Sequence, residues 1–204
     1  MGEASSGIES MSVYEAVIAR YQVDASRSQF VVQGFADGLF SVLGHDPLIA
    51  ICGFGGDARF VPGTLDAGSL LLLVQSDSLV VLNEVSEKDR REMERAMREE
   101  VLEITRYPEA VFMSSHIRPE RMSEGQYQAR ITGHLSLHGV TREHQIAAQV
   151  TVNGNSLRAQ GEFPLRQTDY NIKPYTVAAG ALKLRDELKL SFDIVAIADR
   201  RNAD

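Results

Sequence analysis

The chain has 204 residues, of which 44% are hydrophobic and 24% charged, and its formal net charge is −7. This composition is typical of a globular protein, and the acidic balance argues against a nucleic-acid partner, because such proteins cluster Lys and Arg to neutralise phosphates. The single cysteine, Cys52, excludes an internal disulfide and a cysteine-rich zinc site.

The first segment, residues 1–12, is polar and acidic, and we expect a disordered tail there, followed by a single domain over residues 13–204. The tail has neither the basic nor the apolar stretch of a secretory signal. No segment holds the roughly 18 consecutive apolar residues that span a bilayer as a helix. We therefore expect a cytoplasmic protein, or a periplasmic one if a leader has been removed from this sequence.

The first half of the domain predicts strands over about 17–24, 28–35 and 48–61, with a turn-rich connection over 37–47. Gly53 interrupts the third strand, and a glycine there marks a bulge or bend of the kind a closing barrel needs. We expect the neighbouring Cys52 to be a small buried residue. The run Leu70–Val74 is apolar throughout, so both of its faces must be covered.

One helix is predicted over residues 86–105, and we expect it to supply that cover. Ser86 can cap the first turn, with Asp89 in a position that resembles a capping box, and Pro108 prevents continuation. Apolar residues recur at three- and four-residue spacing and form a stripe: Met93, Met97, Val101 and Ile104. The opposite face, rich in Glu and Arg, is interpreted as a solvated face, with a protein-docking surface as the alternative.

The second half returns to strands, over about 109–118, 126–139, 143–153, 156–166 and 187–198. Asn153-Gly154-Asn155 is a strong hairpin turn between two of them. The sum is an all-β fold of about eight antiparallel strands with one inserted amphipathic helix. Closure of these strands into a barrel would remove their exposed edges.

The segment 130–142 alternates between an apolar and a polar face, because successive strand residues point to opposite sides. The polar face carries Thr132, His134, Ser136 and His138. His138-Gly139-Val140-Thr141 is predicted to turn the chain into the next strand. His134 and His138 lie about 13 Å apart by strand rise, too far to share one metal ion at about 2.1 Å.

A metal-dependent enzyme or sensor that uses His45, Asp46 and histidines from other strands stays open as the alternative function. No G-x-S-x-G segment is present, and no nucleophile and base are placed in contact. We therefore expect a protein that is not an enzyme and uses no metal and no cofactor.

The apolar face predicts the interior of the barrel. A barrel of eight strands has room for packed side chains or for one slender ligand, and ligand cavities are mostly apolar with few polar anchors. The predicted lining consists of Phe112, Ile131, Leu135, Leu137, Phe163, Leu165, Leu190, Phe192 and Ile194. Met93 and Met97 of the helix would plug or gate one end.

Arg166 and Asp169 flank a tight turn near the end of a predicted strand. One interpretation is a local ion pair, worth about 0–1 kcal/mol if exposed. The alternative makes Arg166, together with Tyr170 or Tyr175, a polar anchor for a ligand head group at the barrel mouth.

Four short motifs occur in order along almost the whole chain. They are Tyr21-Gln22-Val23-Asp24 with Ser28 and Phe30, Tyr107-Pro108 through Phe112 with Ser114, Gly133-His134 through Arg142, and Arg166-Gln167-Thr168-Asp169-Tyr170. Together they resemble the YceI-like family of lipid-binding proteins over roughly residues 20–198. The resemblance implies a lipocalin-like barrel that binds a polyisoprenoid, quinone or fatty-acid derivative, and it implies a homodimer as a form common in such proteins.

Overall fold

The computed structural model describes residues 18–37, 46–61, 63–65, 68–177 and 182–199. Fourteen strands are present in this part of the chain: β1 (Ala19–Val23), β2 (Gln29–Gln33), β3 (Ala36–Asp37), β4 (Leu48–Ile51), β5 (Phe54–Phe60), β6 (Ser69–Gln75), β7 (Leu79–Val81), β8 (Glu109–Ser123), β9 (Gln126–Leu137), β10 (Val140–Asn153), β11 (Ser156–Arg166), β12 (Thr176–Val177), β13 (Leu182–Leu184) and β14 (Glu187–Ala198). Helix α1 (Glu87–Ala96) continues into a π-helical turn, Met97–Val101, and short 3₁₀ turns cover Ala25–Arg27 and Gln167–Tyr170. The predicted tail over residues 1–12 lies outside the described residues.

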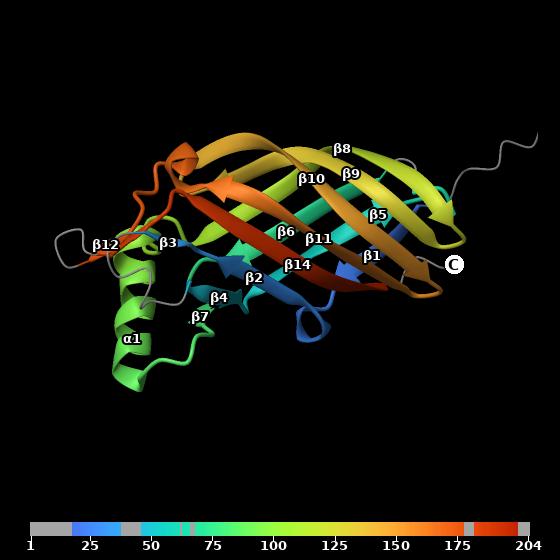
Figure 1. The fold of residues 1–204 in the computed structure, drawn as a ribbon. Helices are drawn as coiled ribbons and strands as arrows, with labels where there is room; N and C mark the ends of the chain where they lie inside the picture. The colour runs from blue at the N-terminus through green and yellow to red at the C-terminus, as the bar shows by residue number, and fades with distance from the viewer. Residues whose placement is uncertain (1–17, 38–45, 62, 66–67, 178–181, 200–204) are drawn as a thin grey trace, which may run out of the picture.

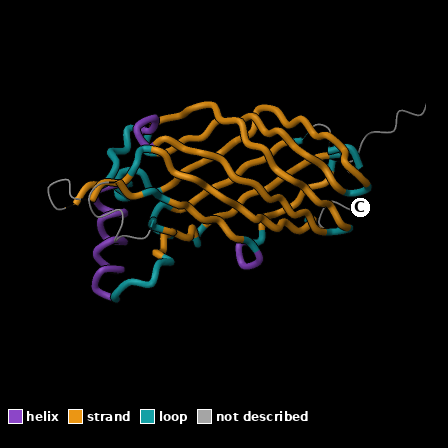
Figure 2. The backbone as a smooth tube through the Cα atoms, viewed as in Figure 1, coloured by secondary structure: helices purple, strands orange, loops and turns teal. Residues whose placement is uncertain are grey.

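The strands form an antiparallel meander that closes on itself (Figures 1 and 2). The order is β1-β5-β6-β8-β9-β10-β11-β14, and β14 pairs with β1 to close the ring. β2, β4 and β7 extend β1, β5 and β6 beyond short interruptions. Among the described strands, β2 pairs with β14 and β4, and β7 pairs with β4 alone. Eight antiparallel strands, three of them bent, therefore make the predicted barrel.

One bend falls at Gly53, between β4 and β5, where the sequence predicts it. A Cβ atom on this glycine would lie 2.7 Å from both the Gln75 side-chain oxygen and the Cβ atom of Ser78. A side chain at this position would therefore force Gln75 or Ser78 to shift, which is consistent with a glycine at the bend.

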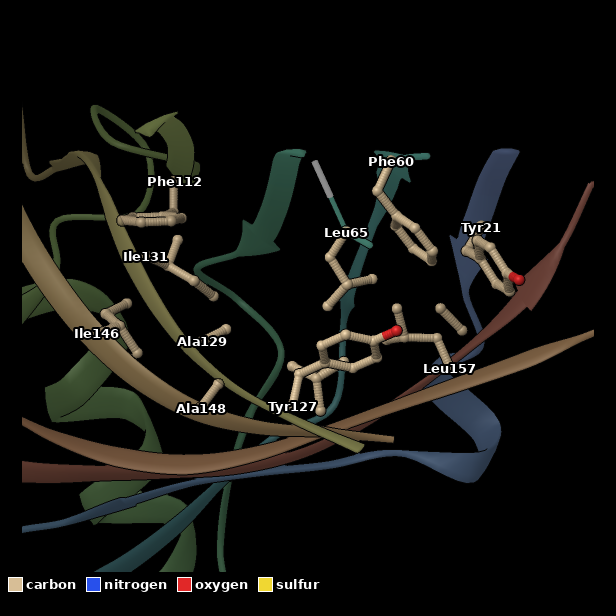
Figure 3. Packing of buried hydrophobic residues seen from close by; sticks show 12 residues of the cluster. Tyr21, Phe60, Leu65, Phe112, Tyr127, Ala129, Ile131, Ile146, Ala148 and Leu157 are labelled. Carbon is tan, nitrogen blue, oxygen red and sulfur yellow. The ribbon is translucent and has the colours of Figure 1, made fainter. Parts of the chain in front are cut away.

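Buried aromatic and aliphatic side chains lie together in the barrel, with Tyr21, Phe60, Leu65 and Tyr127 near one another (Figure 3). The rings of Tyr21 and Phe60 stack with their centroids 5.0 Å apart, and Leu65 and Tyr127 fill the space beside them. The Tyr127 hydroxyl donates a hydrogen bond to the Gly63 carbonyl at 2.7 Å, which fixes the connection between β5 and β6. These side chains form a conventional core and leave the rest of the barrel to form a site.

Helix α1 stands across one end of the barrel, beside β7 (Figure 1). Ser86 caps it, since its hydroxyl oxygen accepts from the Asp89 amide at 3.2 Å. Arg90 donates to the Val81 carbonyl, and the Val81 amide donates to Glu94 Oε1 at 3.2 Å. Two side chains of the helix thereby satisfy the outward backbone groups of Val81, which is 0% exposed.

The helix ends earlier than predicted. The π-helical turn stops at Val101, and Glu103 adopts a positive φ of 46°, a conformation that ends a right-handed helix. Ile104, the last residue of the predicted apolar stripe, therefore lies beyond the helix.

Two further expectations about burial are wrong. The helix packs against β7 and the open end of the barrel, so it does not cover the outer face of β6, and Leu73 there is 40% exposed. Cys52 is exposed rather than buried, because the bend at Gly53 carries it to the surface.

Candidate functional site

The half of the barrel next to α1 encloses a cavity of about 580 Å³. This volume falls within the range of roughly 300–1,000 Å³ that is usual for small-molecule sites. Tyr21, Phe60, Leu65 and Tyr127 do not line it. The cavity therefore ends beside these four residues, and other members of the same buried cluster, among them Leu157 and Ala196, line it.

The predicted apolar residues form the wall of this cavity. All nine apolar residues predicted to face a ligand line it: Phe112, Ile131, Leu135, Leu137, Phe163, Leu165, Leu190, Phe192 and Ile194. They converge because the strand parity sends them inward from β8, β9, β11 and β14. β2, β4, β6 and β10 add further aliphatic side chains, and Met93 and Met97 line the cavity from the helix and the turn that follows it.

Arg166 does not line the cavity, and its predicted pairing with Asp169 is wrong. Its guanidinium Nε lies 3.2 Å from Asp186 Oδ2 at the start of β14. Asp186 also accepts from the Thr168 amide and hydroxyl at 2.8 and 2.7 Å. Burial raises the pKa of Asp186, but these hydrogen bonds and Arg166 outweigh it and lower the pKa below its usual value. Arg166 therefore anchors the turn instead of facing the interior.

Tyr170 is completely buried and does not line the cavity either. Its backbone carbonyl lies 3.2 Å from His138 Nδ1, and its hydroxyl has no hydrogen-bond partner among the described residues. Burial raises the pKa of this phenol to about 12. Tyr175, the other predicted anchor on this segment, does line the cavity.

His138 begins the turn that the sequence predicts, and it therefore does not lie on the outer polar face of the strand. It has a positive φ of 50° and Gly139 one of 76°, so the two residues form the tight hairpin turn between β9 and β10. The turn buries His138, which is 8% exposed, with Nε2 located 2.9 Å from Glu103 Oε2 and the Tyr107 ring 4.2 Å away. His134 lies four residues earlier, on β9, and it is exposed as strand alternation predicts.

His144 lines the cavity and is a site residue that the sequence analysis missed. Its ring stacks on that of Tyr170 at 5.9 Å and meets the edge of Phe163 at 6.1 Å. Burial lowers its pKa, and the charge of Asp169 opposes that effect only in part. The signal was present in the parity of β10, because His144 shares its face with Ile146, which is buried.

The open end of the cavity carries the charged lining. Asp89, Glu92 and Arg95 of α1 contribute to it. The Arg95 guanidinium lies 3.2 Å from Glu99 and 3.3 Å from Glu100, so its charge is already matched by carboxylates.

The alternative metal site can be followed only in part. Asp46 accepts a hydrogen bond from the Ala36 amide at 3.0 Å, and His45 lies outside the described residues. Within the ranges that the structure describes, no three His, Cys, Asp or Glu side chains converge as metal ligands. In the same ranges no helix has the length and apolarity to cross a membrane.

Comparison with known proteins gives one family and one fold. The YceI-like domain profile matches residues 21–196. BcnA of Burkholderia cenocepacia superposes with a TM-score of 0.63 at 18% identity, over 85% of this chain and 98% of its own. A polyisoprenoid binding domain from Saccharophagus degradans gives 0.64 at 14%, over 88% and 98%. A Campylobacter jejuni YCEI protein gives 0.55 at 12%, over 75% and 85%. A search of curated proteins finds no match in sequence.

Proposed function

The chain belongs to the YceI-like domain family, and on this premise we propose that it binds a long lipophilic molecule, such as a polyisoprenoid, inside its barrel without transforming it. The observation that carries the proposal is the hollow, apolar half of the barrel, with its volume of about 580 Å³. A barrel retained only as a scaffold would gain stability by filling this space, because empty apolar volume destabilises a fold.

The shape of the cavity supports a chain-like occupant. It ends beside Tyr21, Phe60, Leu65 and Tyr127 and borders the helix at its other end, so a ligand would lie along the barrel with one end deep in the interior. Transfer of apolar surface from water contributes about 25 cal/mol per Å², which makes a long hydrocarbon a strong ligand for such a lining. The solved domain from Saccharophagus degradans, described as polyisoprenoid-binding, supports the same class of ligand.

The absence of a reaction is part of the proposal. Catalysis needs a nucleophile, a base and an orienting group in contact. Within the described lining the only imidazole belongs to His144, whose ring neighbours are Phe163 and Tyr170. We therefore expect the bound molecule to be recovered chemically unchanged.

Native mass spectrometry of protein purified from cells, followed by organic extraction, tests the proposal. We expect a retained lipophilic mass that disappears in Ala159→Phe, where a large ring enters the cavity from β11. Ala147→Phe makes the same change on an exposed position of β10 and should retain the mass. A chain that carries no extractable lipid and binds no added polyisoprenoid would rule out the function.

A further inference from the structure

The polar groups of the cavity are few and unequally placed. Seven described lining residues have polar side chains: Ser76, Asp89, Glu92, Arg95, His144, Gln167 and Tyr175. The Gln167 amide is already committed, since it donates to the Arg185 carbonyl at 2.8 Å. The three ionic residues lie together on α1, at the open end.

His144 is the polar group set among the inward-facing side chains of the long strands. It lies four residues after Val140, the start of β10, with Phe163 and Tyr170 against its ring. Neither ring nitrogen has a hydrogen-bond partner in the described part of the chain. Burial lowers its pKa, which favours the neutral form of the imidazole, and a neutral imidazole offers one donor and one acceptor. Both nitrogens are therefore available to bond a ligand in the cavity.

The charges around the cavity disfavour an anionic ligand. Among the described lining residues Arg95 is the only Lys or Arg, and it is paired with Glu99 and Glu100. The carboxylates of Asp89 and Glu92 border the same opening. A phosphate or diphosphate would meet like charges there and, deeper in, an apolar wall without a cation, where burial of a charge is costly.

We propose that His144 is the head-group anchor of the cavity and that the ligand carries an uncharged hydrogen-bonding head, a hydroxyl or a carbonyl, rather than a phosphate. This inference rests on the proposed function and narrows its ligand class. A prenyl alcohol or a prenyl quinone fits the description, since each joins an isoprenoid chain to a neutral oxygen.

Isothermal titration calorimetry of the delipidated full chain tests the proposal with three probes that share one isoprenoid tail. The probes are geranylgeraniol, geranylgeranyl diphosphate and the hydrocarbon that lacks the hydroxyl. We expect the alcohol to bind about 2- to 10-fold more tightly than the hydrocarbon, the range one hydrogen bond supplies. The diphosphate should bind at least about tenfold more weakly than the alcohol.

Variants of His144 identify the anchor. His144→Phe preserves the ring contacts and should reduce affinity for the alcohol to that of the hydrocarbon, whose own affinity stays unchanged. His144→Gln keeps a donor and an acceptor and should restore part of the difference. His134→Phe, on the exposed face of β9, is the matched control and should behave as the parent chain. Thermal unfolding of each variant confirms that it folds.

The outcomes separate the two proposals. If none of the probes binds, the proposed function fails and the anchor fails with it. If the probes bind but the diphosphate binds more tightly than the alcohol, the proposed function stands and the role of His144 is overturned. The same conclusion follows if the alcohol still binds more tightly than the hydrocarbon in His144→Phe.

Discussion

The ring of Tyr107 packs on the imidazole of His138, with the two ring centroids 4.2 Å apart. These residues lie 31 positions apart in the sequence and belong to two different motifs. A third motif joins them through the Tyr170 carbonyl, 3.2 Å from His138 Nδ1. The motifs therefore build one corner of the open end of the barrel. Their shared role is to fix the hairpin between β9 and β10, while the ligand lining is spread over the strands.

This corner requires a glycine at position 139. Gly139 has a φ of 76°, and a Cβ atom there would lie 2.7 Å from the Tyr107 ring. Gly139→Ala should lower the free energy of unfolding by about 1–2 kcal/mol for the backbone conformation and by a further 1–3 kcal/mol or so for the clash. Urea denaturation measures the change. Gly154→Ala is the control, because its φ is 54° but no atom lies within 4 Å, and an equal loss in the two variants would show that the contact with Tyr107 is irrelevant.

The unpartnered hydroxyl of Tyr170 should contribute nothing to stability at neutral pH. Tyr170→Phe removes a buried polar atom without a partner, so we expect an unchanged or higher melting temperature. Tyr127→Phe, which loses the hydrogen bond to Gly63, should instead cost about 1 kcal/mol. A marked destabilisation by Tyr170→Phe would mean that the hydroxyl has a partner in solution.

Alkaline pH gives a second measurement on the same residue. Burial raises the pKa of Tyr170 from 10.0 to about 12, so the folded chain keeps a proton that the unfolded chain releases. The shift has no effect on stability below pH 10, and the folded state loses stability relative to the unfolded state as the pH rises from 10 to about 12. The parent chain should therefore lose more stability than Tyr170→Phe between about pH 9 and pH 11, as urea titrations would show.

The lowered pKa of His144 should make the stability of the folded chain depend on pH in the acid range. Burial lowers its pKa below 6.5, so the unfolded chain binds a proton at a higher pH than the folded chain does. Stability from this residue is therefore complete above pH 6.5 and falls as the pH drops toward the pKa of the folded state. His144→Phe should lose less stability than the parent between about pH 7.5 and pH 5, measured by urea denaturation. His134→Phe should keep the parent's decrease, and an identical pH dependence in His144→Phe would contradict the assignment.

Two hydrogen bonds join side chains of α1 to the backbone of Val81 in β7, and a substitution at Glu94 removes one of them. Glu94→Ala removes the acceptor of the Val81 amide, so that amide should exchange its hydrogen about 2- to 10-fold faster. Hydrogen exchange followed by NMR gives the rate. Glu87→Ala, which breaks an exposed pair with Arg91 in the same helix, is the control and should leave the Val81 amide unchanged.

Strand alternation predicted the lining because it depends only on the period of two. Ile131, Leu135 and Leu137 all face the cavity for that reason. The same rule fails at His138, since the hairpin turn begins there and a positive φ removes the residue from the strand pattern.

Long-range pairing was harder to predict than parity. The nearest acid to Arg166 in sequence is Asp169, but the partner is Asp186, which arrives at the turn only when β14 pairs with β11. His144 was missed because a lone histidine belongs to no motif. The parity of β10 places it on the inner face with Ile146, but its ring contacts with Phe163 and Tyr170 require the neighbouring strands to be in place.

The contacts of Arg90 and Glu94 with Val81 also cover the free edge of strand β7. β7 has a strand neighbour on one side only, β4, and the helix occupies the other side with side-chain groups in place of a strand. A movement of α1 that admitted a ligand would uncover this edge, and an unpaired strand edge is a template for pairing with another chain. The helix that lines the open end of the cavity therefore also covers this strand edge.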